Sequence, residues 1–448
     1  MSNIIKLKKG LDIPLAGAPG LAVNRTVFPD TVAVQPSDFK GLNPRLLVRE
    51  GDKVLAGSPV LADKKNPDIL VTSPVSGTVK EVVRGDKRKL LAVVVEADKE
   101  QEYLDFGTSA DGLTAEGVKD ALLKSGLWAA FVQRPYGIVA DPAATPKAIF
   151  VSAFSTAPLA ADTEFTLAAE TAAIQAGVSA LAKLAKVHVS VKSADSAFAG
   201  LRDADIHVVK GKHPAGNVGV QIASISPIRK DETVWTVSPA LLAAIGRLFT
   251  TGRYDVRRTI AVGGPAANGP AYVTTLPGIP MSALKCFYVN ADGVRIISGD
   301  VLSGRTVGEN GWLGFYDTQV TLIKEGTEPE LLGWARPFRF NQYSADHTYF
   351  NWCLGRLGKE VSMDTNLHGG PRAFVMPDSY YAKYLPMDVY PLYLTKACLA
   401  GDIDKMEKFG IYEVLPEDFA LVEFMDPSKN YVQDIIQSGI DLMLKEMA

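Results

Sequence analysis

The sequence predicts an α/β multidomain protein, and three observations support this prediction. Short apolar stretches separated by glycine- and proline-containing turns fill the first hundred residues, as in an all-β unit. Helical and strand patterns then alternate, which favours a mostly parallel sheet covered by helices. The last hundred residues are mainly helical. With 448 residues, and roughly 150 residues per domain, the chain has room for about three domains, give or take one.

The composition is that of a globular protein without a preference for polyanions. The chain is 47% hydrophobic and 22% charged, with a formal net charge of −3, whereas nucleic-acid binders usually carry a concentrated basic stripe. Residues 80–89 form the most basic segment, and Glu81 and Asp86 interrupt it, so we interpret it as a solvated hairpin edge. No stretch approaches the roughly 20 apolar residues of a membrane span, and no signal-peptide core is present. We expect a cytoplasmic chain that only a partner holds at a membrane.

Residues 1–110 are predicted to form an N-terminal all-β domain. Gly51, Gly57 and Gly77 fall where tight turns need positive φ. Pro59 and Pro74 fall at strand starts, where a missing N–H is tolerated. The patterns E-G-D-x-V-x-x-G and S-P-x-S-G-x-V resemble the biotinyl/lipoyl-like barrel-sandwich fold, which is therefore the expected fold of this domain.

The tip of the central hairpin of this domain contains two lysines. In carrier domains of the barrel-sandwich type, the modified lysine occupies this tip, and Lys64 and Lys65 occupy it here. The chain has neither a Met-Lys-Met tripeptide nor a lone Asp-Lys-Ala tip, and Lys-Lys pairs are common in ordinary turns. We favour a fold that is retained without the modification, and a carrier module modified at Lys64 or Lys65 is the alternative.

Residues 111–256 are predicted to form a Rossmann-like α/β domain. Thr114 can cap a helix that ends at Gly126, and Asp162 can cap an alanine-rich helix that runs to about residue 185. Predicted strands cover residues 148–154, 187–191 and 206–210, and a further helix covers residues 241–251. No G-x-G-x-x-G follows any of these strands, so the usual dinucleotide-binding fingerprint is missing.

Two more domains are predicted beyond residue 256. Residues 257–330 carry short strands separated by Gly, Pro, Asn and Asp, which fits a β-grasp-like (SLBB) unit. The predicted strands are residues 258–262, 271–275, 287–289, 294–297 and 319–323. Residues 331–448 are predicted to be mainly helical and to lack cluster cysteines, and their last helix, about residues 431–445, is amphipathic.

The titratable residues form no recognisable metal, nucleophile or redox motif. The histidines are His188, His207, His213, His347 and His368, and the cysteines are Cys286, Cys353 and Cys398. None has metal-ligand spacing, and neither C-x-x-C nor G-x-S-x-G occurs. We interpret His188 and His207 as core or edge histidines and the cysteines as buried or semi-buried thiols. His213 lies in the glycine-rich turn 211–216, which is either a structural turn or a place where backbone approaches a ligand, and His368 is a weaker case.

Motifs spread over nearly the whole chain carry a specific resemblance to one family. They include Ile-Ile-Lys-Leu-Lys-Lys-Gly-Leu-Asp-Ile-Pro-Leu-Ala-Gly at 4–17, Asp-Lys-Lys-Asn-Pro at 63–67, Ser-Pro-Val-Ser-Gly at 73–77, Ser-Gly-Leu-Trp at 125–128 and Gly-Lys-His-Pro-Ala-Gly at 211–216. Another is Arg-Ile-Ile-Ser-Gly-Asp-Val-Leu-Ser-Gly at 295–304. In this order they resemble the A subunits (the NqrA family) of the bacterial Na⁺-translocating NADH:quinone reductase.

The resemblance implies a place in a membrane-bound respiratory complex. That complex oxidises NADH, reduces ubiquinone or menaquinone, and exports Na⁺. FAD, the [2Fe–2S] cluster, FMN and riboflavin are expected in partner subunits, and no cofactor is expected in this chain. The chain is expected to be a peripheral component on the cytoplasmic side of the bacterial inner membrane, docked chiefly on the membrane-embedded B subunit, without an independent active site.

The same architecture is similar to the C subunit of the Rnf complex and the flavin-bearing NADH subunit of respiratory complex I. Those relatives carry a glycine-rich G-x-G-G-A-G-F-P loop that cradles FMN, whereas the matching residues 126–135 include Trp128 and Phe131 here. The stretch comparable to their cysteine-rich cluster loop, residues 411–429, contains no cysteine. A self-sufficient flavin- and NADH-binding subunit of the Rnf or complex I type is therefore the alternative rather than the preferred hypothesis.

The resemblance leaves open whether quinone binds this chain. A quinone needs an apolar slot with one or two hydrogen-bond donors to its carbonyl oxygens. Arg134, Lys212 and His213 lie in loops equivalent to the cofactor cleft of the relatives, so they are the predicted quinone-binding residues. No catalytic residue and no metal ligand is predicted.

Overall fold

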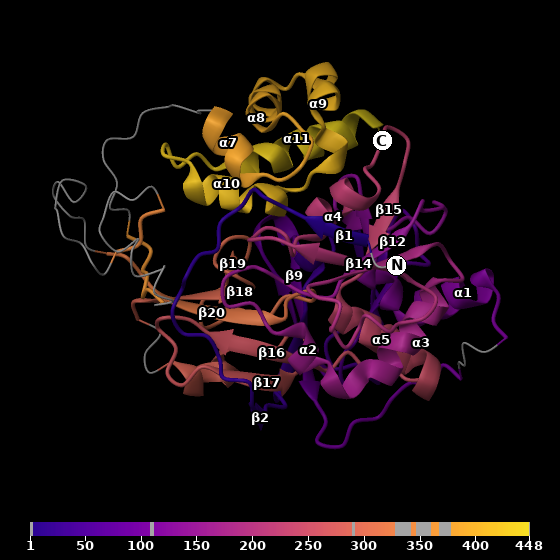
Figure 1. Ribbon diagram of the computed structural model, residues 1–448. Helices are drawn as coiled ribbons and strands as arrows, with labels where there is room; N and C mark the ends of the chain where they lie inside the picture. Colours follow the sequence, from indigo (N-terminus) through magenta and orange to yellow (C-terminus); the bar gives the residue numbers. More distant parts are fainter. Residues whose placement is uncertain are drawn as a thin grey trace.

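The computed structural model describes residues 3–107, 112–288, 292–327, 342–345, 360–366 and 378–447. Its strands form four sheets, and its C-terminal part is helical. In Figure 1 the C-terminal helices, drawn in yellow, lie above the sheets, with the α/β layer and its helices to one side and a second β-rich domain to the other. This is the α/β multidomain class that the sequence predicts.

The N-terminal domain consists of two small antiparallel sheets. One has the order β3 (Thr31–Val34), β9 (Leu90–Ala97), β8 (Gly77–Arg84) and β5 (Lys53–Val54), and the other has the order β4 (Pro44–Leu46), β6 (Pro59–Asp63) and β7 (Leu70–Thr72). Gly51 and Gly57 have φ of 90° and 96°, as predicted. Gly77 also has positive φ, 159°, as predicted, but it begins β8 instead of lying in a tight turn, and a Cβ there would lie 1.9 Å from the carbonyl oxygen of Glu96.

The central sheet is mixed, with a parallel majority. Its order is β1 (Asn3–Lys6), β14 (Asp205–Lys210), β13 (Val187–Val191), β12 (Ile149–Ser152), β15 (Val234–Thr236), β10 (Val132–Arg134) and β11 (Ile138–Val139). The first five strands in this order, β1, β14, β13, β12 and β15, run parallel to one another. The strand β10 is antiparallel to both of its neighbours, β15 and β11. The sequence predicted three of the five parallel strands, β12, β13 and β14, and did not predict β1 or β15.

Helices cover both faces of this sheet. The helices of this domain are α1 (Ala115–Ser125), α2 (Thr163–Thr166), α3 (Thr171–Leu181), α4 (Val218–Ile225) and α5 (Pro239–Thr251). The helices α3 and α5 share a hydrophobic cluster with Val189 on one face, and Ile222 of α4 packs with Phe150 on the other. A Cβ at Gly246 of α5 would lie 1.7 Å from the carbonyl oxygen of Ala173, so glycine permits the close packing of α3 against α5.

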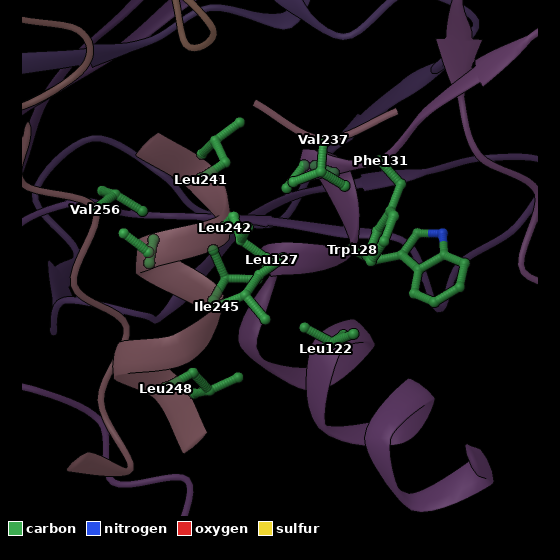
Figure 2. Packing of buried hydrophobic residues seen from close by; sticks show 14 of the residues in the cluster. Leu122, Leu127, Trp128, Phe131, Val237, Leu241, Leu242, Ile245, Leu248 and Val256 are labelled. Carbon is green, nitrogen blue, oxygen red and sulfur yellow. The ribbon is translucent and has the colours of Figure 1, made fainter. Parts of the chain in front are cut away.

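The ends of α1 follow the predicted capping residues. The Thr114 side chain accepts a hydrogen bond from the Gly117 N–H, and Gly126 ends the helix with φ of 79°. Beyond it, Figure 2 shows Leu127 beside Leu242 and Ile245 of α5, while the Trp128 ring points away from that helix. This packing joins α1 to the α/β core.

The β-grasp-like domain forms a six-stranded sheet. Its order is β19 (Arg305–Thr306), β18 (Val294–Ser298), β20 (Gln319–Lys324), β16 (Arg258–Gly263), β17 (Ala271–Thr275) and β2 (Val23–Thr26). A 3₁₀ helix at Met281–Phe287 packs on it. The predicted strand at 287–289 was therefore wrong at Phe287 and at Tyr288, which follows the 3₁₀ helix, and residue 289 lies outside the described residues.

The C-terminal helices have their own hydrophobic cluster. They are α7 (Asp378–Tyr384), α8 (Pro391–Ala400), α9 (Ile403–Phe409), α10 (Ala420–Met425) and α11 (Val432–Met447). Val432, Ile436, Ile440 and Met443 of α11 are buried in this cluster, as the amphipathic pattern predicted. Among the described parts of the chain, no helix combines the length and the apolar character needed to cross a bilayer.

Two predictions about chain path differ from the structure. The predicted helix from Asp162 to residue 185 is broken into α2, a 3₁₀ turn and α3, although the Asp162 cap is confirmed. The hydroxyls of Thr166 and Thr171 bond to nearby backbone carbonyls, which competes with continuous helix. The strands β1 and β2 also leave the predicted 1–110 unit, because β1 pairs with β14 and β2 pairs with β17.

Candidate functional site

The main crevice of the α/β domain opens where the strand order reverses. From β12, the next strands along the chain, β13 and β14, extend to one side, and β15 pairs on the other side. In open parallel sheets, ligands bind outside the carboxyl ends of the strands at such a switch point. The loop 153–157 follows β12 here, and Ser238 follows β15 and caps α5 by accepting from the Leu241 N–H.

A cavity of about 210 Å³ lies in this crevice, between the α/β and β-grasp-like domains. A water molecule needs about 10–15 Å³ on this measure, so the space exceeds that of a few ordered waters. Phe154, Leu167 and Pro239 supply apolar wall from the α/β domain, and Arg258 and Gln319 supply polar groups from the other. Serine and threonine residues and two carboxylates, Asp300 and Asp317, also line the cavity, so its wall is mixed, with an apolar side and many polar groups.

Arg258 is the most unusual residue of this cavity. Its residue surface is 5% exposed, and its Nη1 donates to the Phe315 carbonyl oxygen at 2.7 Å. Its Nη2 has no hydrogen-bond partner within the described ranges. Burial lowers the pKa of Arg258 to about 10, with the nearby Arg247 adding to the effect. A buried guanidinium with an unused donor is costly.

His213 lies behind one wall of the crevice. Its Nδ1 is 3.2 Å from the Thr156 hydroxyl, in the loop after β12, and its backbone N–H donates to Asp12. Its Nε2 is buried and has no partner among the described side chains. Burial lowers the pKa of His213, although Asp300 and Asp12 oppose this, so the imidazole is neutral near pH 7.

Of the other two predicted quinone-binding residues, one is exposed and one is buried. Lys212 lies on the surface beside His213. Arg134 is 1% exposed, and its guanidinium bonds to Asp418 at 2.9 Å and to Glu417, both from the helical domain. Burial alone would lower the pKa of Arg134, but the two carboxylates outweigh it and hold this pKa above its ordinary value. None of the three is a wall residue of the cavity, and their role in quinone binding stays a prediction.

The loop at residues 126–135 is filled by side chains. Trp128 and Phe131 are fully buried, and both pack against Trp235, with ring centroids 5.2 and 5.4 Å away. The Trp128 indole N–H donates to the Ala140 carbonyl at 2.8 Å. The loop interior is therefore occupied by aromatic side chains.

The remaining sequence candidates divide into exposed, buried and undescribed residues. Lys64 and Lys65 are exposed in the turn between β6 and β7, as predicted for the hairpin tip. The prediction of a buried or semi-buried thiol was wrong for Cys286, which is exposed, and is confirmed for Cys398, which is buried. His347, His368 and Cys353 lie outside the described residues.

His188 and His207 are buried, as predicted, and they lie in contact. They are on adjacent strands, with His188 Nδ1 2.9 Å from His207 Nε2. Burial lowers the pKa of both imidazoles, that of His188 to about 4, which keeps both rings neutral near pH 7. Sequence spacing gave no sign of this contact, because 19 residues separate the two histidines.

Sequence reasoning also missed Arg258. An arginine at the start of an apolar strand carries no local signature, and its place in the crevice depends on how the β-grasp-like domain packs against β12 and β15. The switch point follows from the order of strands in the sheet, and that order requires knowledge of the strand pairing, which the sequence does not provide.

The fold and crevice define a class of protein: a multidomain chain with an N-terminal barrel-sandwich domain, a Rossmann-like α/β domain and an SLBB-type domain. Family models described as "NqrA N-terminal barrel-sandwich hybrid domain", "NqrA second alpha/beta domain" and "NQRA C-terminal domain" match residues 5–98, 113–254 and 259–309. These matches confirm the predicted fold class.

Curated relatives match almost the full length. The A subunit of the Na(+)-translocating NADH-quinone reductase of Serratia proteamaculans is 37% identical over 95% of this chain and 96% of its own. The protein of the same name from Actinobacillus pleuropneumoniae is 37% identical over 99% of this chain and 100% of its own. The chain therefore belongs to the family of A subunits of the Na⁺-translocating NADH-quinone reductase. A solved chain of a NAD⁺-reducing [NiFe]-hydrogenase matches at 12% identity with a TM-score of 0.31 over 47% of each chain, too low to carry an argument.

Proposed function

We propose that this chain is the A subunit of a Na⁺-translocating NADH-quinone reductase, a redox-driven Na⁺ pump. It works as a peripheral component on the cytoplasmic side of the inner membrane, docked chiefly on the membrane-embedded B subunit. The names of its full-length relatives support the complex. In this proposal FAD, [2Fe–2S], FMN and riboflavin belong to partner subunits, and the buried Trp128 and Phe131 support a chain without flavin in the loop 126–135.

Two measurements test the docking and cofactor parts. The chain should co-purify from detergent-solubilised membranes with an affinity-tagged B subunit, and its failure to be retained with that tagged protein would contradict docking. The purified chain should lack visible flavin absorbance. A near-stoichiometric flavin spectrum would instead favour an electron-transfer subunit of the Rnf or complex I type.

The proposal extends to quinone, with ubiquinone or menaquinone as the ligand of the crevice cavity. The observation that carries it is Arg258, a buried residue of the cavity wall with one guanidinium nitrogen unpartnered among the described residues. In this proposal the Arg258 side chain turns toward the cavity, a quinone carbonyl oxygen accepts from its guanidinium, and Phe154, Leu167 and Pro239 contact the ring. His213 would take part through the Thr156 hydroxyl that it contacts, and Lys212 would lie on the surface beside His213.

Photo-affinity labelling of the intact complex with an azidoquinone tests this contact. We expect labelled peptides from residues 153–161 and 316–319, and less label in Arg258→Met. The matched control is Arg295→Met, in the same domain, whose guanidinium is already paired with Glu325 at 2.8 Å. Lys212→Met and His213→Asn test the residues predicted from sequence. Label confined to the membrane subunits would overturn the quinone contact and leave the docking role.

A further inference from the structure

Three ligand-type side chains meet at the amino-terminal edge of the central sheet, opposite the crevice. His188 and Asp205 are direct partners in the parallel register of β13 and β14, and His207 follows Asp205 by two residues. Because side chains alternate along a strand, all three lie on the same face. One ligand atom from each lies within 4.8 Å of the other two. We propose that His188, Asp205 and His207 form a binding site for a divalent transition metal, with Zn²⁺ as its best-fitting ion.

The distances require little movement for an ion to enter. Ligand atoms about 2.0–2.1 Å from a tetrahedral Zn²⁺ lie about 3.3 Å from each other. His188 Nδ1 and His207 Nε2 are 2.9 Å apart, so they need to separate by about 0.4 Å. Asp205 Oδ2 is 3.9 Å from His188 Nδ1 and needs to approach by about 0.6 Å. Shifts of this size are available to side chains without moving the strands.

The ligand set and its surroundings favour Zn²⁺ over hard cations. Two imidazoles and one carboxylate suit transition metals, whereas Mg²⁺ and Ca²⁺ prefer oxygen ligands. Phe150 stacks on the His188 ring at 4.9 Å between centroids, which fixes its orientation. Both histidines are more than nine-tenths buried, and Asp205 is exposed, so an ion can reach the site from solvent and a water can complete four ligands.

Metal binding would replace two existing interactions. The proton shared between His188 and His207 would move to the outer nitrogen of the same ring, so both inner lone pairs face the ion with no net proton release. His207 Nδ1 has no partner among the described residues in the empty site, so metal binding breaks no hydrogen bond there. Asp205 Oδ2 would exchange Lys186 Nζ, now at 2.7 Å, for the ion. Lys186 is thus a competitor of the metal.

Calorimetric titration of the untagged, EDTA-treated full-length chain with ZnCl₂ tests the site. We expect one Zn²⁺ per chain at micromolar affinity or tighter, and a four-coordinate Co²⁺ spectrum in the visible range. His188→Gln and His207→Gln should each weaken binding at least 10-fold, while Lys186→Ala should tighten it. The matched control is Asp203→Asn, an exposed neighbouring acid bonded to Ser179, which should bind as the wild type does.

Two outcomes would overturn the proposal. One is the absence of one-to-one binding in the wild-type chain, and the other is equal affinity in the wild type and in both folded histidine variants. Circular dichroism establishes that the variants fold, and Lys186→Ala leaves all three ligands in place, so its tighter binding supports the site independently of the histidine changes. Neither outcome depends on quinone binding.

Discussion

Two buried arginines, Arg134 and Arg258, lie at different domain interfaces and are satisfied in opposite ways. Arg134 joins the α/β sheet to the C-terminal helices through Asp418 and Glu417. Arg258 lies between the α/β and β-grasp-like domains, where it bonds to backbone carbonyl oxygens and lies over the Phe315 ring at 5.8 Å. The pKa of the first is raised by its carboxylates, and the pKa of the second is lowered by burial.

The difference separates a structural ion pair from a candidate ligand donor. Both outer nitrogens of Arg134 are bonded to carboxylates, although its Nε has no partner among the described residues, and Gly219 leaves room for this pairing, because a Cβ there would lie 2.4 Å from Nη1. Arg258 keeps Nη2 unpartnered within the described ranges, beside a cavity. Burial and charge alone do not identify a functional arginine. The hydrogen-bond partners of its guanidinium distinguish a structural role from a ligand-binding one.

The largest expected loss of unfolding free energy is that caused by Arg134→Met. This change leaves Asp418, which is fully buried, without its counter-charge, and breaking a buried pair from one side costs about 3–5 kcal/mol. Urea denaturation measures the loss of unfolding free energy. The double variant with Asp418→Asn should recover part of it, because no buried charge is then left unpaired. A loss below about 1 kcal/mol would show that the pair does not hold the helical domain in place.

An intermediate effect is expected at Asp38, next to the Arg258 interface. Its carboxylate accepts from the Phe315 N–H at 2.8 Å and pairs with Arg305 at 3.3 Å. Burial raises the pKa of Asp38 from 3.8 to about 6. A raised carboxyl pKa means that the native state binds the proton more tightly, so stability from this group is present below about pH 4 and is lost as pH rises through about 6.

Asp38→Asn should therefore stabilise the protein at pH 7 relative to pH 4, by at most about 3 kcal/mol, because two pKa units correspond to that free energy. Asparagine keeps an oxygen that can accept from the Phe315 N–H. The measurement is the difference in unfolding free energy between variant and wild type at both pH values. If this difference were the same at both pH values, the raised pKa of Asp38 in the native state would be contradicted.

The smallest effect on stability is expected for Arg258→Met. The variant loses the hydrogen bond to the Phe315 carbonyl, worth about 1 kcal/mol, but also removes a buried charge without a close carboxylate. The two terms oppose each other, so the unfolding free energy should change by about 1 kcal/mol or less. A loss as large as that of Arg134→Met would make Arg258 a structural residue too, and would remove the main support for a ligand in the cavity.

Much of the fold could be predicted because its signals are local. Thr114 and Gly126 mark both ends of α1, and apolar periodicity predicts β13 and α11. The prediction of one continuous helix over 162–185 was wrong, because it rested on the alanine-rich apolar stripe and took no account of the hydrogen bonds from the Thr166 and Thr171 hydroxyls to nearby backbone carbonyls. The candidate site could be predicted only in part: the predicted His213 lies next to the crevice, whereas Arg258 has no local signature in the sequence.

The sequence by itself determined the fold class, the family and the filling of the 126–135 loop by Trp128 and Phe131. These follow from motifs, capping residues and side-chain volume, which act over a few residues. The tertiary structure alone decided that β1 joins the central sheet, that Arg258 reaches the crevice and that His188 meets His207. Such contacts depend on strand register and domain packing, and a register shift of one residue would turn each histidine to the opposite face.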